Sequence, residues 1–69
     1  MEIKHGFVRL ERGSWLNLSI VKKFTADYGP EGYECTISAI ANHTYIVQEF
    51  QTLEEAQKEL DKILRMNYE

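Results

Sequence analysis

The sequence predicts an α+β domain: a small antiparallel β-meander of three to four strands, with one C-terminal amphipathic helix packed on one face. Two observations support this prediction. Residues 53–66 repeat apolar side chains with helical spacing, and the segments before them alternate apolar and polar side chains between turn sequences. At 69 residues, the chain 1–69 is expected to be a single domain.

The predicted helix begins with a capping box, because Glu55 follows Thr52 by three residues. Its apolar side chains share one stripe, while charged side chains occupy the other faces. The stripe consists of Leu53, Ala56, Leu60, Ile63 and Leu64. Glu54–Lys58 and Asp61–Arg65 have the spacing of favourable ion pairs. A single apolar stripe indicates a single buried face, so the helix is expected to cover a sheet.

Four segments have the two-residue alternation of strands: about 7–12, 15–28, 33–40 and 44–50. Residues 1–5 are expected to be flexible. A short irregularity is expected near Asn17–Ser19, because these side chains can bond nearby backbone groups. The segment from Tyr28 to Gly32 contains two glycines and Pro30, which is typical of a hairpin loop.

Several strands carry apolar side chains on both faces. We expect the helix to cover the face that holds Val8, Leu10, Phe24, Ile37, Ile46 and Phe50. A second apolar group then faces outward; Trp15 belongs to it in one register, and a one-residue change of register would reverse its assignment. The outward group consists of Phe7, Trp15, Val21, Tyr45 and Val47. Such a group on a sheet face is typical of an interface, although scattered exposed apolar residues are also common. We predict a self-association or partner surface.

Charge is distributed unevenly along the chain. Residues 1–26 hold five basic and two acidic residues, whereas residues 27–69 hold three basic and nine acidic residues. The basic residues Arg9, Arg12, Lys22 and Lys23 could form a patch on neighbouring strands, with an aromatic ring between them. The five basic residues of segment 1–26 are few for a nucleic-acid site, and the acidic segment 27–69 repels phosphate. Nucleic-acid binding through this patch is therefore the third hypothesis.

No pattern in the sequence indicates catalysis. His5 and His43 are the two histidines, and neither has the spacing of a paired metal ligand. Cys35 alternates with Tyr33 and Ile37, which predicts a buried structural thiol. We expect no catalytic residue, no metal site and no cofactor.

The sequence also predicts a cytoplasmic protein without membrane contact. It has no run of 18 apolar residues, and the first 15 residues lack the apolar core of a secretory signal. With a single cysteine there is no internal disulfide to support a small core. Association with another chain, most simply as a homodimer, is the expected supplement.

Residues 13–18, GSWLNL, followed by an apolar-basic strand, a glycine turn, a hairpin and TLEEA, resemble short bacterial and phage-encoded proteins. Such proteins pair a small β-meander with one C-terminal helix. The segment from Phe24 to Leu64 is also similar to HicB antitoxin domains, but Glu49-Phe50-Gln51 replaces the glycine usual before the helix. Neither resemblance assigns a functional residue.

Together these observations predict a small cytoplasmic protein-interaction or assembly module that self-associates and has no catalytic activity. The first alternative is a phage- or toxin–antitoxin-type regulator that binds one host protein. The second is a weak nucleic-acid binder that uses the N-terminal basic strands.

Overall fold

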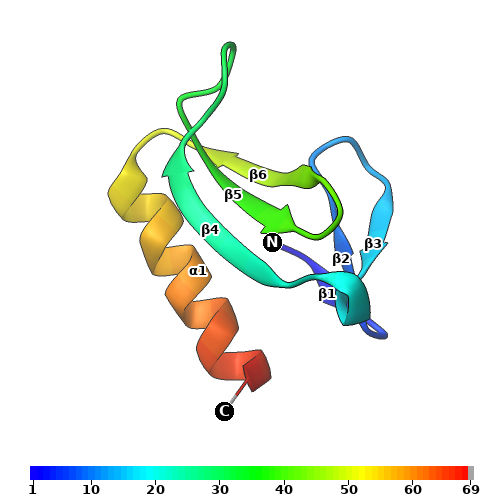
Figure 1. Cartoon of the computed structure of the whole chain (residues 1–69). Coiled ribbons are helices and arrows are strands. Elements are labelled where there is room, and N and C mark those ends of the chain that lie inside the picture. The colour runs from blue at the N-terminus through cyan, green and yellow to red at the C-terminus, as the bar shows by residue number, and fades with distance from the viewer. Residues whose placement is uncertain (69) are drawn as a thin grey trace.

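Antiparallel strands and one C-terminal helix make up an α+β fold, as predicted (Figure 1). The computed structural model describes the backbone of residues 1–68 and the side chains of residues 1–65. Within this range the strands form two three-stranded sheets rather than one meander. The N-terminal sheet holds β1 (Ile3–Lys4), β2 (Phe7–Arg9) and β3 (Trp15–Asn17), and the central sheet holds β4 (Lys23–Tyr28), β5 (Cys35–Ile40) and β6 (Thr44–Phe50). Helix α1 spans Leu53–Tyr68.

The single strand predicted over residues 15–28 is divided in the structure. A 3₁₀ turn, Leu18–Ile20, lies between β3 and β4. The Asn17 side chain accepts a hydrogen bond of 2.9 Å from the backbone N–H of Ser19, which is the local bonding expected for this segment. The turn redirects the chain from the N-terminal sheet to the central sheet.

Within the segment 1–5, which was expected to be flexible, Ile3 and Lys4 form strand β1 of the N-terminal sheet. Ile3 pairs with Val8 and Lys4 pairs with Phe7. The two residues between the strands, His5 and Gly6, both have positive φ (53° and 80°). This combination is typical of the two-residue turns that match the twist of a hairpin. The turn thus allows β1 to pair with β2.

A β-bulge in β6 changes the predicted pattern of buried residues. Ile37 of β5 lies opposite Gln48, but its neighbour Ser38 lies opposite Ile46, so Val47 is an extra residue on β6. An extra residue reverses the alternation of side chains before it. Tyr45 therefore shares the inner face with Ala39, and Ile46 moves to the outer face with Ser38. Val47 is buried, with 4% of its surface exposed.

The core lies where both sheets and the helix meet. It contains Val8, Leu10, Leu16, Ile37, Ala39, Val47 and Ala56. Helix α1 packs mainly on β4, less on β5, and least on β6 (Figure 1). The N-terminal sheet packs near β6, on the side of the inner face that α1 covers least. In the connection after β2, the Glu11 N–H donates to the Ile46 carbonyl of β6 (3.1 Å). No helix in the described part is long and apolar enough to cross a membrane.

The start of α1 has the predicted capping residues. The backbone N–H of Glu55 donates to Thr52 Oγ1 (3.2 Å), and the Thr52 hydroxyl donates to Glu55 Oε1 (3.0 Å). The glutamate therefore bonds the hydroxyl rather than the Thr52 amide. Lys58–Glu54 (3.2 Å) and Arg65–Asp61 (3.6 Å) form the two predicted ion pairs.

Thr52→Ala is expected to lower the free energy of unfolding by about 1 kcal/mol, because the Glu55 amide loses its acceptor. In a domain of this size the melting temperature should fall by about 4–8 °C. Thermal unfolding followed by circular dichroism measures the change. Thr52→Ser keeps the acceptor and should melt close to wild type; an equal loss in both variants would contradict a capping role.

Candidate functional site

The outer face of the N-terminal sheet brings aromatic and charged side chains together. Strand register sets out two rows across the three strands: Lys4, Phe7 and Asn17 in one, and Glu2, Arg9 and Trp15 in the other. Glu2 belongs to the second row because the Arg9 N–H donates to its carbonyl (2.9 Å). We call these six residues the N-terminal face. It combines two aromatic rings with two cations.

Both rings of the N-terminal face are exposed to solvent, Phe7 by 40% and Trp15 by 42%. Their positions are diagonal across β2 and β3, a separation of about 7–8 Å between neighbouring strands. Lys4, His5, Phe7 and Trp15 line a shallow pocket of about 330 Å³. The strands beneath are held by Val8 and Leu16, which are buried in the core. The rings thus sit on a fixed support.

The cations of this face differ in their partners. Arg9 pairs with Glu2 at 3.6 Å, and both side chains remain about half exposed. An exposed pair of this kind contributes little to stability, about 0–1 kcal/mol. Lys4 has no ion-pair partner among the described side chains. Lys4 is therefore the cation most available to an outside carboxylate.

The five residues predicted to form one apolar surface occupy three different environments. Phe7 and Trp15 are exposed on the N-terminal face. Val21 and Tyr45 are half-buried and pack against the core. Val47 lies within the core, because the bulge turns it inward. The outward position predicted for Tyr45 and Val47 is therefore corrected, and the exposed rings of the predicted surface are Phe7 and Trp15.

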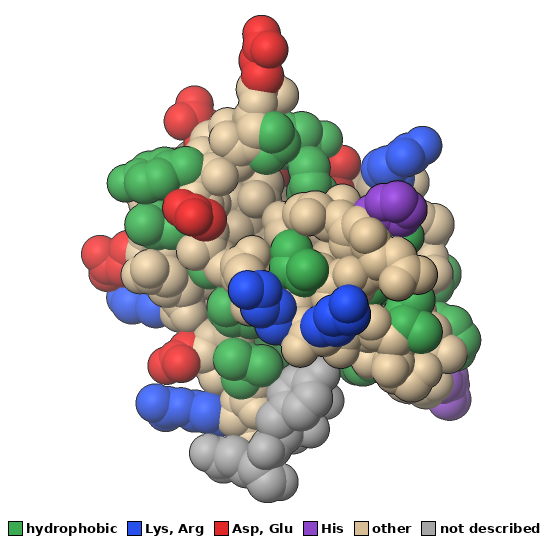
Figure 2. Space-filling view, in the orientation of Figure 1, with side chains coloured by type: hydrophobic (Ala, Val, Ile, Leu, Met, Phe, Trp, Pro, Cys, Tyr) green, Lys and Arg blue, Asp and Glu red, His purple; other side chains and the backbone are tan. Residues whose placement is uncertain are grey.

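The predicted basic patch is divided between the two sheets. Arg9 lies on β2 and Arg12 in the turn that follows it. Lys22 and Lys23 lie at the start of the central sheet, where the Lys22 N–H bonds to Ile40 O (2.7 Å) and Lys23 pairs with Ile40. A continuous four-cation track on neighbouring strands is therefore absent among these residues. The acidic side chains gather mainly over α1 and the β4–β5 hairpin (Figure 2).

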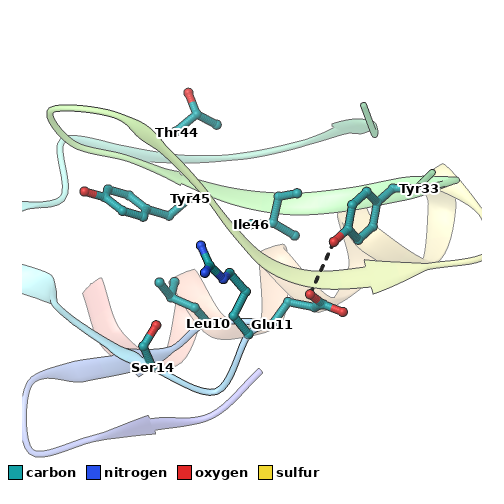
Figure 3. A pocket seen from close by; sticks show the side chains of 8 residues that line it. Leu10, Glu11, Ser14, Tyr33, Thr44, Tyr45 and Ile46 are labelled. Carbon is teal, nitrogen blue, oxygen red and sulfur yellow. Dashed lines mark hydrogen bonds between the residues drawn. The ribbon is translucent and has the colours of Figure 1, made fainter. Parts of the chain in front are cut away.

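A second, more polar pocket of about 270 Å³ lies where the two sheets meet (Figure 3). Leu10, Glu11 and Ser14 line it from the connection between β2 and β3, and Tyr45 and Ile46 line it from β6. The Tyr33 hydroxyl reaches across and donates to Glu11 Oε2 (3.3 Å). The sequence alone does not reveal this pair, because no local pattern links residues 22 positions apart.

Neither reactive side chain near these surfaces is activated. The negative charge of Glu11, followed by burial, raises the pKa of Tyr33 above its ordinary value. Burial, followed by the charges of Glu34 and Asp27, raises the pKa of the Cys35 thiol. A raised pKa disfavours the tyrosinate and the thiolate, which are the nucleophilic forms. Cys35 is buried and free, as expected for a structural thiol.

The described residues contain no cluster of three or more His, Cys, Asp or Glu side chains suited to a metal ion. Comparison of the chain with protein-family models, with curated proteins and with solved structures finds no match. The N-terminal face therefore has to be interpreted from its own chemistry.

Proposed function

We propose that this chain is a cytoplasmic, non-catalytic protein-interaction module that binds an acidic protein surface through the N-terminal face. The observation that carries the proposal is the side-by-side exposure of Phe7 and Trp15, flanked by Lys4 and Arg9. Cytoplasmic placement accords with the free thiol of Cys35.

Aromatic rings supply most of the binding energy in many protein interfaces, above all tryptophan and tyrosine. A ring held on a strand loses little conformational freedom when a partner covers it. Phe7 and Trp15 have this placement, because the strands that carry them bury Val8 and Leu16 on the opposite side. Both rings can therefore serve as anchors.

Charge supports an acidic protein rather than a second copy of the same face. A two-fold contact of this face with itself would bring together two surfaces of the same net positive charge, since each carries Lys4 and Arg9 against Glu2, and like charges disfavour such a contact. Nucleic acid is less favoured, because Arg9 is already paired with Glu2 and the net charge of the chain is −3. A phage- or toxin–antitoxin-type regulator would be a special case with one host partner.

Trp15 is the only tryptophan, so its fluorescence reports directly on the proposed surface. We expect a peptide of alternating Glu and Leu to change the emission saturably and to bind more weakly as salt rises. The same peptide with Gln in place of Glu should bind at least tenfold more weakly, which is a difference of about 1.4 kcal/mol. Lys4→Glu should also weaken binding of the acidic peptide.

Lys62→Glu, on the exposed side of α1, is the matched control and should leave this affinity unchanged. A single-stranded oligonucleotide tests the alternative partner. A stronger and more salt-sensitive response to the oligonucleotide than to the acidic peptide would replace the proposal with nucleic-acid binding. No response to either probe would contradict a binding role for this face.

A further inference from the structure

Strand β4 is the open edge of the central sheet. Sheet order is β4-β5-β6, and no described strand pairs with β4 on its outer side. The Gly29 N–H donates to Glu34 O (3.0 Å), which shows that the odd-numbered residues of β4 are the ones whose backbone groups bond to β5. Because bonding alternates along an antiparallel strand, the N–H and C=O groups of Phe24 and Ala26 point away from β5. An unpaired edge of this kind is a template for another strand.

Apolar side chains accumulate beside this edge. Three of the exposed large hydrophobic residues are Ile20 just before β4, Tyr28 at its end and Leu64 on α1, with exposed fractions of 48%, 72% and 37%. Leu64 and Phe24 line a depression of about 250 Å³ together with residues 21–23. Tyr28 is the most exposed of these side chains. The edge thus offers both backbone groups and apolar surface.

We propose that two copies of the chain associate by antiparallel pairing of β4 with β4, with Thr25 at the two-fold axis. The result is a continuous six-stranded sheet with both helices on the same side. Phe24 then lies opposite the partner's Ala26, so the outward N–H and C=O groups of both residues are satisfied. Lys23 lies opposite the partner's Asp27, and both side chains belong to the outer face of the sheet.

Charge selects this register over the neighbouring ones. Residues whose backbone N–H and C=O groups point away from β5 must lie opposite one another across the two copies of β4. This condition allows the two-fold axis to pass through Phe24, Thr25 or Ala26. An axis at Phe24 pairs Lys23 with Thr25, and an axis at Ala26 pairs Thr25 with Asp27. Only the axis at Thr25 brings Lys23 opposite Asp27, twice in each dimer. Opposite charges directly across strands are stabilising, and like charges are destabilising.

The same register provides a site for Tyr28. It places the partner's Tyr28 opposite Lys22 and diagonal to Phe24, on the side that carries α1. Phe24, Lys22 and Leu64 line the depression described above. The exposed ring of each copy therefore covers the apolar depression of the other. No residue of the N-terminal face takes part, so this assembly is separate from the proposed binding of an acidic partner.

Light scattering after size exclusion, over a wide concentration range, tests the proposal. Wild type should approach twice its 8.1 kDa chain mass as concentration rises. Asp27→Lys and Lys23→Asp each place like charges across the axis, and each should weaken dimerisation at least tenfold. The double variant Lys23→Asp/Asp27→Lys restores opposite charges and should recover the dimer. Tyr28→Ser should also weaken it, whereas Trp15→Ser should leave the mass unchanged.

Circular dichroism of each variant at low concentration establishes that it folds, as expected for exposed positions. A wild-type monomer at all concentrations would overturn the proposal. A dimer that withstands Asp27→Lys, or a double variant that stays monomeric while folded, would overturn the pairing through β4. Loss of the dimer in Trp15→Ser alone would assign self-association to the N-terminal face instead.

Discussion

Val47→Glu is expected to leave the chain unfolded at 25 °C. Val47 is the bulge residue of β6, is 4% exposed, and belongs to the core that joins both sheets and the helix. A carboxylate there would be buried without a partner, a change that costs more than about 4 kcal/mol. In a chain of this length a single hydrophobic core rarely supplies more than about 3–5 kcal/mol, so this cost is enough to unfold it. Circular dichroism and urea unfolding should show loss of the cooperative transition.

Thr44→Glu is the matched control for this substitution. It adds the same side chain to the same strand, at an exposed position. We expect a change within about 0.5 kcal/mol, the usual range for surface positions. A folded Val47→Glu protein with near wild-type stability would show that Val47 faces solvent, as the simple alternation of β6 had predicted.

Ile37→Ala is expected to lower the free energy of unfolding by about 2–5 kcal/mol. Ile37 is fully buried at the centre of β5, between Ala26 of β4 and Gln48 of β6. Ile37 belongs to the core that joins both sheets and the helix, and such a core relaxes only partly around the space that the substitution leaves. Urea titration gives the free energy, and the slope of the transition checks that unfolding stays two-state.

Ile20→Ala removes the same atoms from a side chain that is 48% exposed, and should cost less than half as much. Equal losses at the two positions would contradict the burial of Ile37.

Much of the fold could be predicted because its signals are local. The Thr52 capping box, the ion pairs of α1 and the irregularity after Asn17 depend on residues two to four positions apart, and all of them are found in the structure. The alternation of Val8 and Leu16 with their exposed neighbours also holds. These features need no knowledge of which strands become neighbours.

The remaining features depend on pairing between distant residues. A bulge is a property of two strands together, so the sequence of β6 alone could not show that Val47 turns inward. The division into two sheets follows from the 3₁₀ turn and from the pairing of β1, which is too short to give a pattern. The Tyr33–Glu11 bond and the open edge of β4 likewise appear only in three dimensions.

The same distinction applies to the candidate site. Phe7 and Trp15 could be assigned to one surface because each lies on a short alternating strand. The positions of Tyr45 and Val47 could not be predicted, since the bulge in β6 changes the face on which each side chain lies. The interface role of the two remaining rings stays a prediction, and the Trp15 titration tests it.

We propose two separate contact surfaces for the chain, one of which pairs it with its own copy through β4. Amide hydrogen exchange measured by NMR at several protein concentrations tests this most directly. If β4 pairs with its own copy, amide exchange at Phe24 and Ala26 slows as concentration rises, while exchange at Thr25, already bonded to β5, changes little. Exchange at Phe24 and Ala26 that is equally fast at every concentration would contradict it.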